Sequence, residues 1–121
     1  MVPLQASIVI RTFNEEKHLP RLLNALDKQA YRGFEIVVVD SGSVDRTREI
    51  IAPYADKLLH IERHDFTFGY SLNVGIEAAS APYAVLISAH TMPTDGNWLE
   101  ALLKPFIEPP AGQPTAMSYG R

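Results

Sequence analysis

Polar side chains gather at the points in the sequence where three apolar, strand-like runs stop. The polar segments are 11–15, 40–45 and 88–91, and they follow apolar runs at 7–10, 34–39 and 83–87. The carboxyl ends of parallel strands meet at one edge of a sheet, and open α/β proteins bind ligands at that edge. The sequence therefore predicts a small-molecule site built from these three segments.

Asp40 is the most suggestive single residue in these segments. It directly follows a buried-strand pattern and does not itself stand at the start of a helix. A carboxylate at a strand end can accept hydrogen bonds from a base or a ribose. For Asn14, Ser43 and Asp45 a structural alternative stays open, because these residue types also act as helix N-caps.

Several familiar chemistries are excluded by missing motifs. The chain has no G-x-G-x-x-G, no G-x-x-x-x-G-K-[ST], no H-E-x-x-H and no G-x-S-x-G. Dinucleotide-binding folds with that fingerprint, P-loop NTPases, zincin metalloproteases and nucleophile-elbow hydrolases are therefore not expected. The absence of cysteine rules out disulfides, thiolate zinc sites and cysteine nucleophiles.

The elements that would position these residues alternate along the chain. Short β-rich apolar runs suit strands buried on both faces, and apolar residues spaced by three and four predict helices between them. The expected strands are 7–10, 34–39, 57–61 and 83–87, with a last short run at 115–119 after a Pro-rich surface loop at 108–114. The expected helices are 15–30, a short one from Ser43 or Asp45 to 51, 69–79 and 98–106. Repeated strand–helix units predict an α/β fold with a mainly parallel sheet and helices on both faces.

The order of the motifs resembles that of the family 2 glycosyltransferases of the GT-A fold. The resemblance rests on Ile8-Val9-Ile10-Arg11-Thr12-Phe13-Asn14-Glu15-Glu16, on 35–47, and on Asn73-Val74-Gly75 followed by 83–87. It covers nearly the whole chain and implies a Rossmann-like GT-A half-domain. The implied activity is transfer of a sugar from a nucleotide-diphosphate donor to an acceptor hydroxyl, with inversion, in cell-surface polysaccharide or glycan synthesis. The implied partners are this donor and a saccharide or lipid-linked acceptor.

The resemblance also assigns candidate nucleotide-sugar-binding residues. Thr12, Asn14 and Glu15 would lie in the first nucleotide-facing loop, Asp40 would contact the base, and the segment after it would shape that pocket. The full candidate set is Thr12, Asn14, Glu15, Asp40, Ser41, Gly42, Ser43, Asp45, Asn73, Ser88 and His90.

The sequence departs from the family pattern after the fourth strand. The family's Asp-x-Asp element, which binds ribose and a divalent metal, is replaced by Ser88-Ala89-His90. This segment is similar to that of a bacterial, rhamnosyltransferase-like subset of the family. His90 could ligate Mg²⁺ or Mn²⁺ or donate a hydrogen bond to phosphate, whereas a serine cannot replace an aspartate as a ligand for a hard cation.

The family's catalytic base is a carboxylate beyond the fifth strand, and no carboxylate of this sequence matches its position, so no catalytic residue is assigned. We therefore expect residues 1–121 to be the nucleotide-sugar-binding portion of a GT-A domain truncated at its C-terminus. An uncovered last strand would favour a homo-oligomer.

Composition sets outer limits on the function. The chain of 121 residues (13.5 kDa) has room for one domain, and its net charge is −3. This balance gives no electrostatic reason to bind nucleic acid or an anionic membrane. The start of the chain lacks the features of a signal peptide, and no apolar stretch reaches about 20 residues. We therefore expect a cytoplasmic protein, with any membrane association through parts absent from this chain.

Two alternative functions remain. The chain could bind a nucleotide sugar without catalysing transfer. It could also be a receiver-like signalling domain, since Met92-Pro93-Thr94-Asp95-Gly96 resembles a motif of that class. Against the second, Ala89 stands where the phospho-accepting aspartate belongs, and Arg11 and Thr12 stand where an acidic pair is needed.

Overall fold

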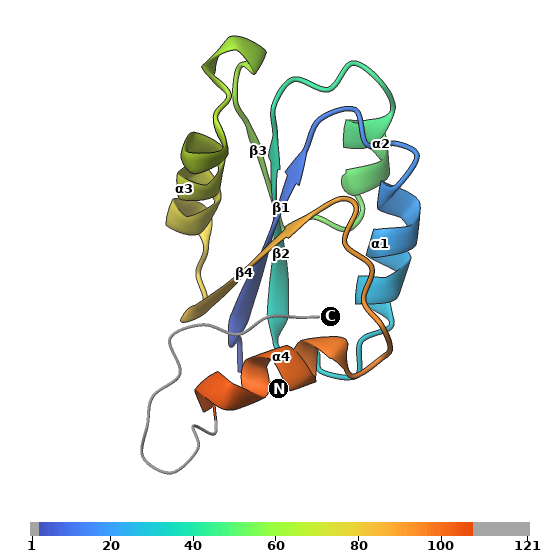
Figure 1. The fold of residues 1–121 in the computed structure, drawn as a ribbon, viewed down its shortest axis with the longest axis vertical. Coiled ribbons are helices and arrows are strands. Elements are labelled where there is room, and N and C mark those ends of the chain that lie inside the picture. The colour runs from blue at the N-terminus through green and yellow to red at the C-terminus, as the bar shows by residue number, and fades with distance from the viewer. Residues whose placement is uncertain (1–2, 108–121) are drawn as a thin grey trace.

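The computed structural model describes residues 3–107, which form a four-stranded parallel sheet between two layers of helices (Figure 1). The strands are β1 (Ala6–Thr12), β2 (Phe34–Asp40), β3 (Lys57–His60) and β4 (Tyr83–Ser88). The helices are α1 (Leu19–Asp27), α2 (Thr47–Ile51), α3 (Phe68–Ala78) and α4 (Trp98–Ile107), with a short 3₁₀ helix, η1 (Arg63–Asp65). The spatial order of the strands is β3-β2-β1-β4.

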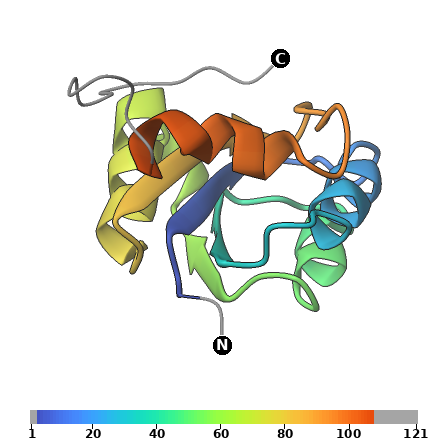
Figure 2. The same ribbon diagram turned by 90° about the horizontal axis from the view of Figure 1, so that it is seen from below.

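The register of the sheet sends alternate side chains into two separate cores. Ile10 of β1 lies beside Val38 of β2 and Ile87 of β4, and these residues pack in the core beneath α1, α2 and α4. Val9 faces the other side, in a smaller core that α3 covers. Figure 2 shows α3 on one side of the sheet and α1 and α2 on the other. Burial on both faces explains why the strands are nearly continuous apolar runs.

Gly75 lets α3 lie close against the sheet. A Cβ atom at this position would clash with Cγ1 of Val9 and would lie 3.2 Å from Cγ2 of Val39. The helix therefore depends on a missing side chain at its closest approach to β1 and β2.

A buried polar network lies at the opposite end of the sheet from the predicted site. Glu35 accepts hydrogen bonds from the Ser7 hydroxyl and the Ser80 N–H, and its other carboxylate oxygen is 3.6 Å from Nζ of Lys57. Burial alone would raise the pKa of Glu35, but these partners outweigh it and hold the pKa below its ordinary value. The charged form of Glu35 therefore stabilises the fold.

The predicted fold class is confirmed, while the predicted start of the first helix is wrong. α1 begins at Leu19 and not at residue 15, and its N-cap residue is His18. Asn14 is not a cap, because it lies in a turn with a positive φ of 50°. The N-cap residue of α2 is Arg46 and not Ser43 or Asp45, although Asp45 accepts the N–H of Thr47.

The strand order also separates the candidate functions. Receiver-like domains have the flavodoxin-like order 2-1-3-4-5, whereas this sheet has the order 3-2-1-4 of nucleotide-binding doubly wound folds. The receiver alternative is therefore wrong. The predicted loop 108–114 and strand 115–119, with the oligomer edge inferred from it, lie outside the described residues. Among residues 3–107, no helix is long and apolar enough to span a bilayer.

Candidate functional site

Side-chain hydrogen bonds join the loops that follow β1 and β2. The N–H of Asn14 donates to Oγ of Ser43 (2.8 Å), and Oδ1 of Asn14 accepts the N–H of Val44 (2.8 Å). Further along, the N–H of Glu15 donates to Oγ1 of Thr47 (2.7 Å). These hydrogen bonds therefore join the two loops into one unit at the carboxyl edge of the sheet.

Asp45 and Ser41 extend this unit at its two ends. Asp45 accepts hydrogen bonds from Thr47 and from the N–H of Glu16. Desolvation would raise the pKa of Asp45, but these hydrogen bonds lower it overall. Ser41 donates both its N–H and its hydroxyl to the carbonyl of Thr12.

Asp40 lies at the centre of the joined loops and is only 1% exposed. One carboxylate oxygen accepts the hydroxyls of Thr12 and Ser43, and the other accepts the N–H groups of Gly42 and Ser43. Nε of Arg48 lies 3.4 Å from the second oxygen. All of these hydrogen-bond partners belong to the protein itself. Asp40 therefore holds the loop around Gly42, whose φ is 93°, in its conformation.

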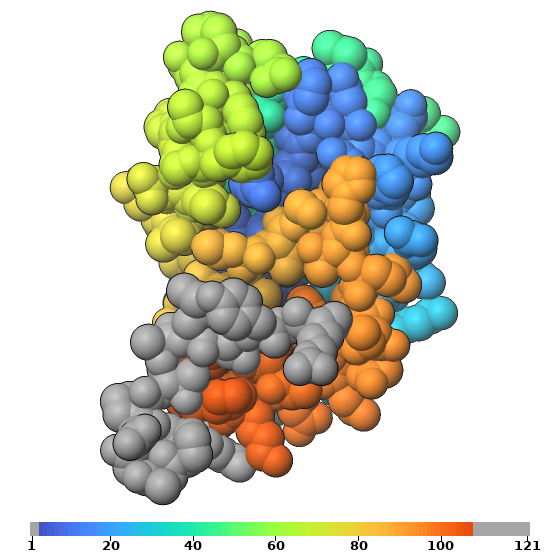
Figure 3. Space-filling view, viewed as in Figure 1, coloured from blue at the N-terminus to red at the C-terminus, as the bar shows by residue number. Residues whose placement is uncertain are grey.

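A second group of side chains lies where β4 ends. Nε2 of His90 is 3.2 Å from Oε2 of Glu15, and the ring of His18 packs against that of His90 at a tilt of 44°, with centroids 4.2 Å apart. One ligand atom from each of these three residues lies within 4.8 Å of the others. In the space-filling view, the orange segment after β4 borders the blue segment after β1 (Figure 3).

The donor set at this place bears on the expected metal. Ser88 uses its hydroxyl to accept the N–H of His90, and the segment 88–90 contains no carboxylate. Glu15 supplies the missing carboxylate, and His18 adds a second imidazole. The residues therefore fit a divalent ion, although two imidazoles suit Mn²⁺ or Zn²⁺ better than Mg²⁺, which prefers oxygen ligands.

Sequence reasoning missed His18 and Arg63. His18 could have been found from the spacing Glu15-x-x-His18, which a single turn folds onto one side. The guanidinium carbon of Arg63, in η1, lies 4.0 Å from the centroid of the Phe13 ring. No motif pointed to Arg63, because only the fold brings η1 next to the loop after β1.

Asn73 is not turned toward the sheet. It is exposed on α3 and, within residues 3–107, its side chain makes no hydrogen bond. Gly75, about 200° further round the helix, is the position that faces β1 and β2. Any contact of Asn73 with a ligand would thus involve the outer surface of α3.

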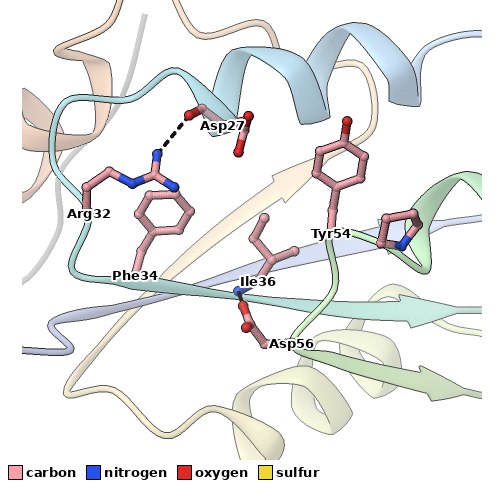
Figure 4. Close-up of a pocket in the computed structure, with 7 residues that line it drawn as sticks. Asp27, Arg32, Phe34, Ile36, Tyr54 and Asp56 are labelled. Carbon is pink, nitrogen blue, oxygen red and sulfur yellow. Dashed lines mark hydrogen bonds between the residues drawn. The ribbon is translucent and has the colours of Figure 1, made fainter.

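A hollow among the described residues lies elsewhere, near the start of β2 (Figure 4). It holds about 230 Å³, less than a typical ligand pocket of roughly 300–1,000 Å³. Its polar groups are used internally: Arg32 donates to the carbonyl of Asp27 (2.8 Å), and Asp56 accepts the N–H of Ile36 (2.7 Å). This hollow is therefore not the predicted site at the carboxyl edge.

Comparisons with known proteins agree with the motif order. The family model "Glycosyl transferase family 2" matches residues 7–120. The chain is 40% identical over 87 residues to validoxylamine A glucosyltransferase of Streptomyces hygroscopicus subsp. limoneus, covering 67% of this chain and 19% of that protein. It is 32% identical over 92 residues to the poly(ribitol-phosphate) beta-N-acetylglucosaminyltransferase TarS of Staphylococcus aureus (strain Mu50), covering 71% of this chain and 16% of that protein.

Solved structures show the same fold. The structure of S. aureus TarS 1–349 in complex with UDP-GlcNAc has a TM-score of 0.74 and 27% identity, covering 85% of this chain and 32% of that one. The mannosyltransferase PcManGT of Pyrobaculum calidifontis, in complex with GDP-Man and Mn²⁺, has a TM-score of 0.75 and 22% identity, covering 89% of this chain and 34% of that one. The fold is thus that of GT-A glycosyltransferases. The chain is also 25% identical over 111 residues to glycosyltransferase GlyA of Streptococcus pneumoniae serotype 4, covering 89% of this chain. It spans only 16% of the length of GlyA and 16% of the length of TarS.

Proposed function

Because the chain belongs to glycosyl transferase family 2, we propose that it binds the nucleotide-diphosphate sugar donor of an enzyme that transfers the sugar to an acceptor hydroxyl. The observation that carries this proposal is the joined pair of loops at the carboxyl edge of a 3-2-1-4 sheet, which is where such folds bind nucleotides. The polar residues predicted after β1 and β2 take part in this unit, whereas Ser88 and His90 form the neighbouring group at the end of β4.

Within this site the candidate residues divide into two roles. Asp40, Ser41, Ser43 and Asp45 hold the loops in place through the hydrogen bonds described above. A nucleobase would lie against the Arg63–Phe13 pair, since planar guanidinium and aromatic groups both stack on flat rings. Asp40 would act on the base indirectly, by fixing the loop around Gly42.

The donor diphosphate would extend toward the end of β4, where Ser88, His90 and Glu15 lie. A divalent ion bound there would neutralise the charge that develops on the leaving diphosphate. The imidazole of His90 is also exposed enough to donate a hydrogen bond to phosphate, with its side chain 60% accessible. TarS was solved with UDP-GlcNAc, and we propose a UDP-sugar as the donor of this protein as well.

We further propose that acceptor binding and the catalytic base of an inverting reaction come from beyond residues 1–121. This proposal rests on the small share of its relatives that the chain covers. The acceptor would be a saccharide or lipid-linked glycan in a cell-surface pathway on the cytoplasmic side. The chain alone would then bind donor without turning it over, which is also what a binding module without catalysis would do.

Titration calorimetry with UDP, GDP and dTDP, each with and without Mn²⁺, tests the donor site. We expect UDP to bind and Arg63→Ala to weaken binding about fivefold, because one stacking contact is worth about 1 kcal/mol. Arg46→Ala is the matched control, since Arg46 is also an exposed arginine and its Nε pairs with Oε2 of Glu49 at 2.6 Å. Absence of heat with all three nucleotides from a folded chain would rule out the proposed site.

A further inference from the structure

Glu15, His18 and His90 form a mixed cluster of two imidazoles and one carboxylate, here called the His₂Glu cluster. Glu15 and His18 come from the turn between β1 and α1, and His90 comes from the segment after β4. They meet because β1 and β4 are adjacent parallel strands, so that the segments following them leave the same edge of the sheet. The cluster therefore joins parts of the chain that are more than 70 residues apart.

The distances in the cluster are near those that a metal ion requires. Ligand atoms about 2.1 Å from a tetrahedral ion lie about 3.4 Å from one another. The Glu15–His90 pair is already at 3.2 Å, and no pair exceeds 4.8 Å. His90 has an exposed side chain, so a small rotation could complete the set.

The backbone already holds the carboxylate end of the cluster in place. The N–H of Glu15 is bonded to Thr47, and its carbonyl accepts the N–H groups of His18 and Leu19. The Glu15 side chain is only 19% exposed. Two of the three ligand residues are thus fixed by one hydrogen-bonded turn before any ion binds, which lowers the entropic cost of binding.

The geometry points to a divalent metal site formed by Glu15, His18 and His90. Two neutral imidazoles and one carboxylate are the ligand types of open transition-metal sites, in which further positions remain for water or substrate oxygens. The ion would be of the Zn²⁺, Co²⁺ or Mn²⁺ class and not Mg²⁺. Two of the three ligands come from the loop after β1. The Asp-x-Asp pattern of family 2 glycosyltransferases, which follows the fourth strand, does not predict ligands in that loop.

The ion would face the donor diphosphate, and this second part rests on the proposed function. Metal binding itself does not, because the cluster is formed by the protein alone. A measurement with metal and no nucleotide can therefore fail or succeed independently of the donor site.

The test is calorimetric titration of the chain with Zn²⁺ alone, together with the visible absorption of added Co²⁺. The four histidines of the chain allow a matched pair of variants. His18→Ala/His90→Ala removes both imidazoles of the cluster. His60→Ala/His64→Ala removes the other two, which are also partly exposed and lie 3.6 Å from a carboxylate each.

We expect one ion per chain for the unmodified protein and for His60→Ala/His64→Ala. His18→Ala/His90→Ala and Glu15→Gln should each weaken binding by at least tenfold, since even partners outside the ligand set cost roughly 10- to 100-fold. Thermal unfolding followed by circular dichroism should show all variants folded, because none of the altered side chains is in the core.

Two results would overturn the inference. One is that the unmodified chain and folded His18→Ala/His90→Ala have the same affinity for Zn²⁺, or that neither binds it. The other is loss of binding in His60→Ala/His64→Ala with retention in the cluster variants. Either would leave the cluster as a contact of His90 with Glu15 and with the tilted ring of His18, without a metal site.

Discussion

Replacing Asp40 by alanine should destabilise the whole chain and not merely weaken a ligand contact. The carboxylate accepts four hydrogen bonds, from the hydroxyls of Thr12 and Ser43 and from the N–H groups of Gly42 and Ser43. Asp40→Ala leaves these donors without their acceptor in a place that is 1% exposed. Each buried donor left unsatisfied costs about 1–3 kcal/mol. Water that enters the vacated space can accept some of these hydrogen bonds and so reduces the total destabilisation.

We therefore expect Asp40→Ala to lower the free energy of unfolding by about 2–4 kcal/mol. Asp40→Asn should cost about 1 kcal/mol, because the amide oxygen can still accept both N–H groups while the hydroxyls turn to accept from its NH₂ group. If Asp40→Ala proves too unstable to fold, Asp40→Asn still tests the reasoning. Asp65→Ala, which removes an exposed carboxylate that lies 3.6 Å from Nε2 of His64, is the control and should change stability little.

Urea unfolding followed by tryptophan fluorescence measures these differences. Trp98 is the single tryptophan and is 7% exposed in the main core, so its emission reports loss of packing. A change of about 3 kcal/mol moves the urea midpoint by about 1–3 M. If Asp40→Ala unfolded within about 0.5 kcal/mol of the unmodified chain while losing nucleotide affinity, Asp40 would be a ligand contact and the positioning role would be refuted.

Two further substitutions test the packing and the buried network. Gly75→Ala should destabilise the chain by about 1–3 kcal/mol, because the added methyl group meets Val9 and overpacks the interface of α3 with the sheet. Gly69→Ala is the control, because Gly69 lies on the same helix and the new methyl group would meet no neighbouring atom within 4 Å, so the change should be neutral or stabilising. Equal losses of thermal stability at both positions would refute the close-approach argument. Glu35→Gln should reduce the pH dependence of stability, because the pKa of Glu35 is lowered in the folded chain. The charged Glu35 side chain then contributes its full stabilisation above the ordinary glutamate pKa of about 4.3. This stabilisation is lost as the pH falls through the lower pKa of the folded state. The difference in free energy of unfolding between the unmodified chain and Glu35→Gln should therefore shrink from pH 7 toward pH 3 in urea titrations, and a constant difference would contradict this assignment.

The candidate site could be predicted only in part from the sequence. Its location followed from polar segments after apolar runs, and the structure does bring Glu15 and His90 together. The orientation of the side chains did not follow. Asn14 and Ser43 have the residue types of helix caps, yet the side chain of each accepts a backbone N–H from the other loop, 29 or 30 residues away. A residue type records what a side chain can bond to, and the fold decides which partner is within reach.

The amino-acid sequence by itself determined the four strands, the alternation of strands and helices, and the family. These depend on local signals, since a run of buried β-branched residues or a spacing of three and four is complete within one element. Only the tertiary structure decided that Asp40 is enclosed, that Arg63 lies over Phe13, and that His18 joins Glu15 and His90. Each of these is a contact between segments that meet only because of strand order and register, so the local sequence pattern cannot predict it.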